Sequence, residues 1–445
     1  MTTPDLSTIM TDLPVLRRGD AEYGDAARTL LGDGDPELVV RPRSAADVAA
    51  AVQTAHRDGL ALTVRAGGHS MAGLSLASDG LLLDLRSMAE IEVDPPTRIV
   101  RIGGGATWGA VATALQPHGL GITAGDTAGV GVGGLTLGGG IGWMARRYGL
   151  AIDSLIGAQL VTAAGEILEV SAREHPDLFW SLRGGGPGSG VVTRFDFRAQ
   201  QVGDVLFGTI MFEPSDTAGL LAGWRDVQRD ADERLTTVLS MMPAMGEHPP
   251  MVMVQVCFDG PAAEAQGYVD QLLGIGQVLS SDLSVRPYAE VLEDEDRPPG
   301  VRVAVTSTFL DLDDPALAAL VALHADGGAM VSLRGLGGAV ARVPAESTAF
   351  AHRSAEAMAV ALRFLPGAPE PGEDVIPGWA AVAEQGSGTY INFSSAADES
   401  MLAAAFPPPT RERLRRTRSE HDPRGMLSVR ATAGAPANSR GAVAD

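Results

Sequence analysis

The stretch VRAGGHSMAG, residues 64–73, carries one histidine, His69, directly after two glycines and before a serine. The apolar run LALTV, residues 60–64, leads into it and predicts a short strand. A strand that runs into consecutive glycines exposes several backbone N–H groups at one concave point, and such a point holds phosphate without any lysine. The stretch therefore indicates either an anion-binding loop with an imidazole beside it or an ordinary surface loop.

The basic residues of the chain exclude several classes of protein. All 34 are arginines, because the 445 residues contain no lysine. This excludes a lysine Schiff base, and with it an ordinary pyridoxal-phosphate site, as well as the nucleotide-binding lysines of P-loop NTPases and protein kinases. With 55 acidic residues the net charge is −21, which argues against nucleic acid and an anionic membrane surface as partners.

The only cysteine, Cys257, lies in the strand-like run MVMVQVCF, residues 251–258. One cysteine forms neither an intramolecular disulfide nor a thiolate zinc cluster, so we expect a buried apolar residue and no metal site. The N-terminal residues show no signal-peptide pattern, and no run approaches the ~20 apolar residues that span a bilayer. We therefore expect a soluble cytoplasmic protein.

Residues 36–200 show the alternating helix and strand patterns of an α/β region. SAADVAAAVQTAHRDG, residues 44–59, predicts a helix that begins after Ser44 as N-cap and ends at Gly59. The runs LLLDL (81–85) and RIVRI (98–102) predict strands, and TWGAVATALQPHG (107–119) predicts a helix. Two glycine-rich stretches follow, at residues 125–149 and 183–193. Because Val, Leu and Ile alternate with the glycines of the first, we expect closely packed backbone there rather than a flexible linker.

The sequence pattern changes near residue 204. Strand-like segments alternate with helix-like segments, and the last strand predicted is GTYINFS, residues 388–394. The other predicted strands are VLFGTIMF (205–212), LTTVLSMMP (235–243), MVMVQVCF (251–258), VRVAVTSTFL (301–310) and AMVSLRGL (329–336). This pattern predicts an antiparallel sheet backed by helices. The tail PTRERLRRTRSEHDPRGM, residues 409–426, predicts a basic helix.

Four segments together resemble a known family. They are VVRPRSAADVAAAV (39–52), VRAGGHSMAGLS (64–75), GVGVGGLTLGGGIGWMARRYGL (129–150) and HPDLFWSLRGGGPGSGVVTRFDF (175–197). Their ordered set resembles the FAD-linked oxidases of the vanillyl-alcohol-oxidase superfamily, and most closely its berberine-bridge-enzyme-like branch. The resemblance covers residues 36 to 425. It implies a two-lobed α+β fold, with an FAD-binding domain at residues 1–203, to which residues 397–445 return, and a substrate domain at 204–396.

The resemblance also implies the cofactor and its attachment. His69 occupies the place of the histidine that these relatives join to the 8α-methyl carbon of FAD. Thr127 stands where many relatives carry a second, cysteinyl link, so we expect a single covalent link. Further flavin contacts are implied for the three glycine-rich segments that carry the resemblance. These residues are Arg65, Ala66, Gly67, Gly68, Ser70, Gly125, Thr127, Ala128, Gly129, Gly133, Gly134, Gly140 and Val192.

The segment TYINF, residues 389–393, resembles the Y-x-N-Y motif of the family. The second tyrosine of that motif is Phe393 here, which has no ionisable group. Tyr390 keeps the first position and is the best phenolic candidate among the five tyrosines. On a strand Asn392 would share its face and could orient the substrate or the tyrosine. The last motif of the chain, after Asp422 and Pro423, also differs from that of the family, because Arg430 and Thr432 stand where relatives have asparagines. The contact of the C-terminal segment with the flavin domain is therefore in doubt.

The function implied is that of an FAD-dependent oxidase. A C–H bond of a small alcohol, sugar or natural product would give a hydride to the flavin, and O2 would reoxidise the flavin to yield H2O2. Tailoring of secondary metabolites is the first role that we consider. The alternatives are a carbohydrate oxidase, a flavin-dependent dehydrogenase and a flavin-carrying binding protein without catalysis. The sequence leaves the substrate and the oligomeric state open.

Overall fold

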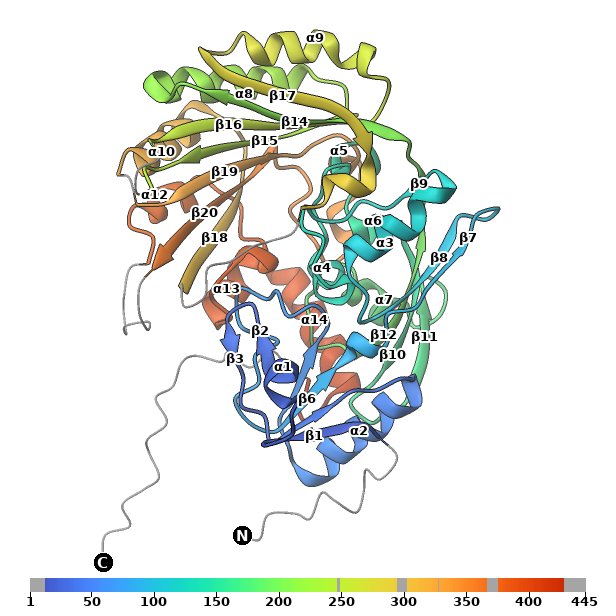
Figure 1. The fold of residues 1–445 in the computed structure, drawn as a ribbon. Coiled ribbons are helices and arrows are strands. Elements are labelled where there is room, and N and C mark those ends of the chain that lie inside the picture. Colours follow the sequence, from blue (N-terminus) through green and yellow to red (C-terminus); the bar gives the residue numbers. More distant parts are fainter. Residues whose placement is uncertain (1–12, 246–248, 294–301, 327, 366–374, 428–445) are drawn as a thin grey trace, which may run out of the picture.

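The computed structural model describes residues 13–245, 249–293, 302–326, 328–365 and 375–427. Its N-terminal part holds a four-stranded sheet in the order β1-β4-β6-β5 (Figure 1). These strands are β1 (Val15–Arg17), β4 (Leu38–Val40), β6 (Leu81–Asp84) and β5 (Leu62–Arg65). Helix α2 (Ala45–Asp58) packs on this sheet and begins and ends as the sequence predicts. The Ser44 side chain accepts a hydrogen bond from Asp47 N at 3.1 Å, and Gly59 ends the helix at φ 67°.

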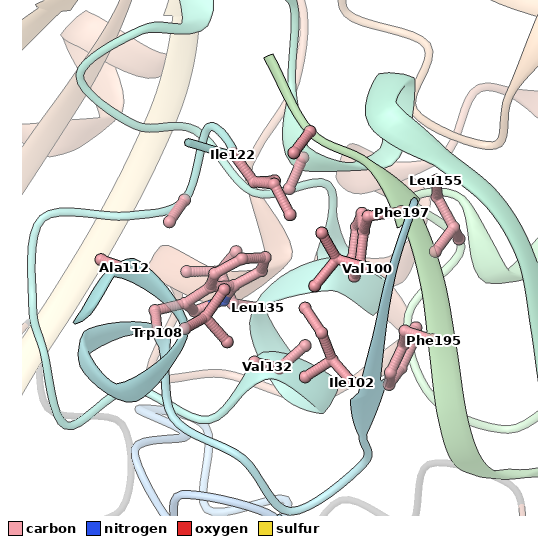
Figure 2. Packing of buried hydrophobic residues seen from close by; sticks show 14 of the residues in the cluster. Val100, Ile102, Trp108, Ala112, Ile122, Val132, Leu135, Leu155, Phe195 and Phe197 are labelled. Atoms are coloured by element: carbon pink, nitrogen blue, oxygen red, sulfur yellow. The ribbon is translucent and has the colours of Figure 1, made fainter. Parts of the chain in front are cut away.

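A second sheet has five antiparallel strands in the order β11-β10-β12-β8-β7. They are β11 (Ile167–Ser171), β10 (Leu155–Val161), β12 (Val191–Arg198), β8 (Ile99–Gly103) and β7 (Ile91–Asp94). Helix α3 (Trp108–Leu115) packs against it, and the ring of Trp108 meets that of Phe197 edge-on at 5.7 Å. Figure 2 shows this core, in which Val132 from the first glycine-rich stretch packs beside the same rings.

The first glycine-rich stretch is folded and packed, which confirms that it is no flexible linker. It contains α4 (Val132–Gly138) and α5 (Ala145–Tyr148), with α6 (Ala151–Ser154) directly after it. Most of its residues between 131 and 149 are buried. Glycine is required at Gly142, for example, where a Cβ would overlap the carbonyl oxygen of Ala124.

A seven-stranded antiparallel sheet follows, in the order β17-β14-β16-β15-β19-β20-β18. Its strands are β14 (Asp204–Phe212), β15 (Leu235–Met242), β16 (Met251–Phe258), β17 (Val278–Pro287), β18 (Arg302–Leu310), β19 (Met330–Gly335) and β20 (Ala357–Leu365). One face is covered by helices α8 (Thr217–Asp230), α9 (Ala262–Leu273), α10 (Asp314–Ala325) and α12 (Trp379–Ala383) (Figure 1). The predicted antiparallel sheet backed by helices is therefore confirmed. Cys257 is fully buried in it, as expected.

One predicted strand is wrong. Residues 388–394 do not extend as a strand, because Ile391–Phe393 forms the 3-10 helix η7. Phe393 N donates to Tyr390 O at 2.9 Å and closes this turn. The segment bonds to β18 on either side of it, where Tyr390 N donates to Ser307 Oγ at 3.0 Å and Ser395 N donates to Val305 O at 2.8 Å. The edge of β18 thus holds both ends of the segment and leaves its middle free to turn.

The C-terminal part returns to the N-terminal sheets. The predicted basic helix is α14 (Pro408–His421), which follows α13 (Glu399–Ala405) and packs on α7 (Pro176–Leu182). Beyond α14 the Asp422 carboxylate accepts hydrogen bonds from Met426 N and Leu427 N, at 2.9 and 2.7 Å. The Met426 side chain packs in the cluster that contains Val40 and Val161. Arg430 and Thr432 of the altered closing motif lie outside the described residues.

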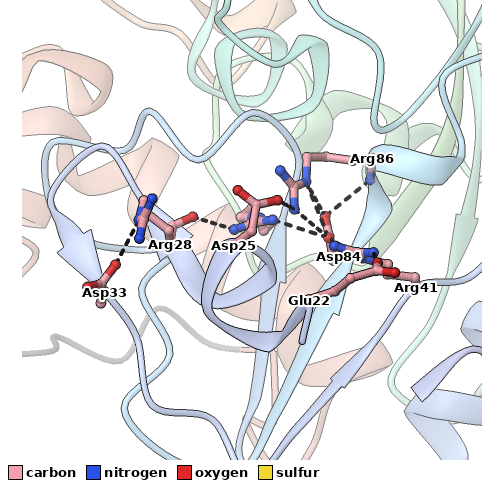
Figure 3. Close-up of polar contacts among 8 residues, drawn as sticks. Glu22, Asp25, Arg28, Asp33, Arg41, Asp84 and Arg86 are labelled. Carbon is pink, nitrogen blue, oxygen red and sulfur yellow. Dashed lines mark hydrogen bonds and ion pairs between the residues drawn. The ribbon is translucent and has the colours of Figure 1, made fainter. Parts of the chain in front are cut away.

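A buried ion cluster joins the carboxyl ends of β5 and β6 (Figure 3). The Asp84 carboxylate is fully buried and pairs with the equally buried guanidinium of Arg65 at 3.1 Å. Arg86 and Arg41 pair with the same carboxylate at 3.0 and 3.3 Å. Burial opposes ionisation of Asp84, but the hydrogen bond from Arg86 and the charges of Arg65 and Arg86 outweigh it and hold the pKa of Asp84 below its usual value.

No helix in the described part of the chain has both the length and the apolar character needed to cross a bilayer. The same residues contain no group of three or more His, Cys, Asp or Glu side chains placed to hold a metal ion.

Candidate functional site

Two glycine-rich loops meet where β5 ends. A Cβ at Gly67 would overlap the main-chain nitrogen of Gly131, and a Cβ at Gly131 would overlap that of Gly67. The backbones can therefore approach this closely only because both residues are glycines. His69 lies beside the same junction, since a Cβ at Gly129 would come within 3.2 Å of its Nε2. The two motifs that the sequence singled out thus form one site around the imidazole.

The Arg65 side chain takes no part in this junction. Its guanidinium is turned into the ion cluster, where it pairs with Asp84 and donates to the carbonyl oxygen of Arg28. The pair fixes the last residue of β5, from which residues 66–70 begin. Any cofactor contact at Arg65 must therefore use its main chain.

Several of the other predicted contact residues are held by protein packing. A Cβ at Gly133 would lie 3.1 Å from the Gly104 carbonyl oxygen, and one at Gly125 would lie 2.9 Å from Leu135 Cδ1. A Cβ at Gly140 would overlap that of Ala151, and the Val192 side chain belongs to the core of the five-stranded sheet. Gly134 differs, because it is exposed and open space surrounds its Cβ position.

The loop at residues 125–131 is also tied to the seven-stranded sheet. Asp126 forms an ion pair with Arg334 of β19, and Thr127 Oγ1 donates to the Asp126 carboxylate at 3.1 Å. The main chain adds two bonds, Glu293 N to Asp126 O at 3.0 Å and Ala128 N to Glu293 O at 2.8 Å. Burial opposes ionisation of Asp126, yet the charge and hydrogen bond of Arg334 prevail and lower its pKa. The sheet face that carries Arg334 therefore faces the loop at residues 125–131, which lies beside His69.

Sequence reasoning did not find this ion pair. The sequence carried two signals: Asp126 is the only acid of the glycine-rich stretch 125–149, and Arg334 is the only charged residue of the apolar segment AMVSLRGL. The two residues are 208 positions apart, so neither signal could indicate the other.

The two predicted catalytic residues contact each other and the end of α4. Tyr390 is buried, and its hydroxyl oxygen accepts hydrogen bonds from Gly140 N at 2.9 Å and from Asn392 Nδ2 at 3.0 Å. Asn392 Nδ2 also donates to Leu135 O at 3.1 Å. Burial raises the pKa of Tyr390 in spite of these donors. The contact expected between the two residues is present, but the 3-10 turn makes it rather than a shared strand face.

A family model described as an FAD binding domain matches residues 36–171, which include both loops and His69. Among curated proteins, (R)-6-hydroxynicotine oxidase from Paenarthrobacter nicotinovorans is 37% identical over 261 residues, 58% of this chain and 57% of that protein. Glucooligosaccharide oxidase from Sarocladium strictum is 36% identical over 212 residues, 47% of this chain and 42% of that protein. The matched region spans 57–65% of the length of the first three curated relatives.

The fold is shared along the whole chain. The structure of 6-hydroxy-D-nicotine oxidase from Arthrobacter nicotinovorans superposes with a TM-score of 0.84 at 28% identity, covering 96% of this chain and 98% of that one. Residues 36–171 are thus an FAD-binding domain, and the chain has the fold of FAD-linked oxidases of the vanillyl-alcohol-oxidase superfamily. The superfamily fold extends to a berberine-bridge-enzyme-like protein of Physcomitrella patens, with a TM-score of 0.83 at 21% identity and coverage of 94% and 96%.

A third structure of the superfamily fold differs at the attachment site. It is glucooligosaccharide oxidase from Acremonium strictum, described with a 6-S-cysteinyl, 8α-N1-histidyl FAD. Its TM-score is 0.80 at 24% identity, with coverage of 94% of this chain and 96% of that one. In the present chain Thr127 stands at the position where the resemblance places the cysteine of many relatives, and its hydroxyl donates to Asp126.

The residues at this junction fit FAD. Glycines let the two loops pack main chain against main chain at Gly67 and Gly131, and the partly exposed residues 66, 67, 69 and 70 leave main-chain groups accessible to a diphosphate, as is required where no lysine is present. The imidazole of His69 is half-buried beside it, which suits a nucleophile that attaches a ring system. FAD bound there would take two electrons with a hydride and pass them to O2 or another acceptor.

The hydrogen bonds of Tyr390 give a testable stability prediction. Tyr390→Phe is expected to lower the free energy of unfolding by about 1–3 kcal/mol, because Gly140 N–H loses its buried acceptor and the Asn392 amide loses one of its two. Urea unfolding of purified protein measures the change. Tyr148→Phe is the matched control, since its hydroxyl donates to Gln201 O at the protein surface and its loss should matter little. Equal midpoints for Tyr390→Phe and the unchanged protein would contradict the predicted network.

Proposed function

We propose that this protein is an FAD-dependent oxidase of a small organic substrate and that it releases H2O2. The observation that supports this most directly is the meeting of the two glycine-rich loops around His69. The family match over residues 36–171 and the relatives named above, which are oxidases, support it further. The hydride would come from a C–H bond at a carbon that carries oxygen or nitrogen.

We further propose that the flavin is attached by a single covalent link, through His69. The half-buried imidazole lies beside bare main chain, where a ring system can approach it. A second link of the cysteinyl type has no sulfur to use, because Thr127 stands at that place and the only cysteine, Cys257, is buried in the sheet. A single buried thiol needs no oxidising compartment, so it is compatible with the cytoplasmic location that we propose.

The active site that we propose lies between two lobes, residues 1–203 with 397–445 and residues 204–396. The Asp126–Arg334 ion pair ties the flavin loop to β19, and the bonds to Glu293 tie it to the segment that follows β17. The packing of Met426 on the N-terminal sheet supports the return of the C-terminal segment.

Tyr390 is the residue that we propose handles the substrate proton, with Asn392 positioning it. Two hydrogen bonds donated to its oxygen stabilise the phenolate, the form that accepts a proton. Burial raises its pKa, so the base form should gain population as the pH rises, and the rate should rise with it. If Tyr390 is the base, Tyr390→Phe lowers kcat by about 10²–10⁴-fold and removes this pH dependence.

A substrate screen that follows H2O2 tests the activity. Alcohols, amines and sugars are offered to the flavin-loaded protein, and H2O2 is compared with product. Equimolar H2O2 is expected for an oxidase, whereas turnover that needs an added electron acceptor means a dehydrogenase. The protein is also photoreduced and exposed to air, and recovery of the yellow colour within seconds is expected. Slow recovery, with no substrate that bleaches the flavin, would mean a binding protein without catalysis.

A further inference from the structure

The face of the seven-stranded sheet opposite to α8, α9, α10 and α12 packs in part on the first lobe, and it also carries a cluster of methionines. We call it the methionine face. It consists of five of the 15 methionines of the chain, Met211, Met242, Met251, Met253 and Met330. Each is partly exposed, although neighbouring positions on the same strands, such as Val252 and Val254, are fully buried against the helices. Alternation along a strand therefore puts the methionines on the side opposite to α8 and α9.

The strand register makes this face continuous. Met211 of β14 is the direct partner of Met253 of β16, and Met251 of β16 is the partner of Met242 of β15. Met330 of β19 faces Leu362 of β20, which is also partly exposed. The apolar surface thus crosses five adjacent strands in two rows.

The same face leads to the proposed flavin site. Arg334 stands on it, four residues along β19 from Met330, and pairs with Asp126 of the loop beside His69. Its guanidinium also lies 5.2 Å from the ring of Phe393, next to the predicted catalytic pair. At about 3.3 Å per residue, the two methionine rows lie about 7 and 13 Å beyond the Arg334 row. A molecule held at the flavin would therefore extend over the methionines.

The composition of the two rows selects the class of molecule. In the described strands, the other side chains in these rows are small hydroxyls or aliphatic groups, with no charge and no aromatic ring. These residues are Ser240, Ser280, Ser307, Ser332, Val305, Val360 and Leu362. Two charged residues stand in the next row on the loop side: Arg334, which is neutralised by Asp126, and the exposed Asp282 on the edge strand β17. An oligosaccharide would bury many hydroxyls against such a surface with few partners, which costs free energy for each unpaired group.

Given the proposed oxidase, on which this inference rests, we propose that the methionine face binds the apolar body of an uncharged substrate. Flexible, polarizable thioethers adapt to varied apolar shapes, which suits a lipid-like or aromatic natural product rather than a sugar chain. Phe364, exposed on the same face next to Val303, would extend the surface for a longer substrate.

The test uses equilibrium binding to the flavin-loaded protein under argon. Tertiary alcohols from 2-methyl-2-butanol to 2-methyl-2-octanol, which have no C–H bond to give at the carbon that carries oxygen, and methyl β-cellotrioside, whose reducing end is blocked, are titrated while the flavin absorbance is followed. We expect the Kd to fall about three- to fourfold with each added CH2 group, and methyl β-cellotrioside to give no shift at the same concentrations. In the double variant Met242→Gln/Met253→Gln, each added CH2 group should lower the Kd by less than about twofold. Ile167→Gln, which changes an exposed apolar residue on β11 of the other lobe, should keep the full slope.

Flavin content and urea unfolding midpoint are checked first, so that a misfolded variant is not compared. An unchanged slope in the double variant, or tighter binding of methyl β-cellotrioside than of 2-methyl-2-octanol, would overturn the inference. Failure of the proposed oxidase gives a different result. In that case no substrate yields H2O2 in air, while the dependence on CH2 groups under argon is still measured.

Discussion

Replacing His69 by alanine is expected to leave no yellow colour in the acid-precipitated protein, whereas the unchanged protein keeps all of its colour in the pellet. The reason is that the imidazole beside the Gly67–Gly131 junction is the only attachment point that we propose for FAD. The variant should still bind FAD reversibly, because the main-chain cradle does not depend on the side chain at position 69. The absorbance of the washed, redissolved pellet measures the link.

The matched control for this experiment is His118→Ala. His118 is exposed after α3 and lies outside both glycine-rich loops, so its pellet should stay fully coloured. If the fully loaded unchanged protein leaves all of its colour in the supernatant, the proposed covalent link is contradicted. Colour in the His69→Ala pellet would show that the flavin is attached to a residue other than His69. Both results are read from the pellet, so they hold whether or not a substrate is known.

The sequence predicted those helices and strands whose ends or faces are determined by residues close together in the chain. Ser44 and Gly59 bound α2 as expected, because a hydroxyl cap and a left-handed glycine act within a few residues. Strand β17 was missed, and most of its residues are exposed because it lies at the edge of the sheet, so apolar alternation is weak. Strand β20 was missed because AMAVALRFL is nearly continuous in apolar residues, and such a run does not distinguish a strand from a helix.

Long-range contacts decide what the sequence could not predict. The segment around Tyr390 alternates like a strand, but its turn follows from bonds to Ser307 and Gly140, each more than 80 positions away. The family resemblance implied a flavin contact of Arg65 but did not say what its side chain does. The fold places the guanidinium in the cluster around Asp84, where burying it without a carboxylate would be costly. The ordered motifs thus placed the glycine-rich loops together, whereas the partners of individual side chains required the fold.

The ion cluster at Asp84 gives the largest expected change in stability. Asp84→Asn is expected to lower the free energy of unfolding by about 3–5 kcal/mol, because the fully buried Arg65 guanidinium loses its compensating charge. Since Arg65 is the residue from which the His69 loop begins, the variant should also bind FAD less tightly. Urea unfolding at pH 7 and flavin content measure the two effects. Asp33→Asn, which breaks only the exposed pair with Arg28, should change neither.

The acid dependence of this cluster has a definite sign. The pKa of Asp84 is lower in the folded protein than in the unfolded chain, where it is about 4, so its contribution is fully present above pH 4. As the pH falls below 4 toward the folded pKa, protonation of the carboxyl removes that contribution. The variant Asp84→Asn lacks this carboxylate at every pH. Its free energy of unfolding should therefore fall less steeply between pH 5 and pH 3 than that of the unchanged protein. Equal slopes for the two proteins would show that Asp84 is not held ionised by the arginines around it.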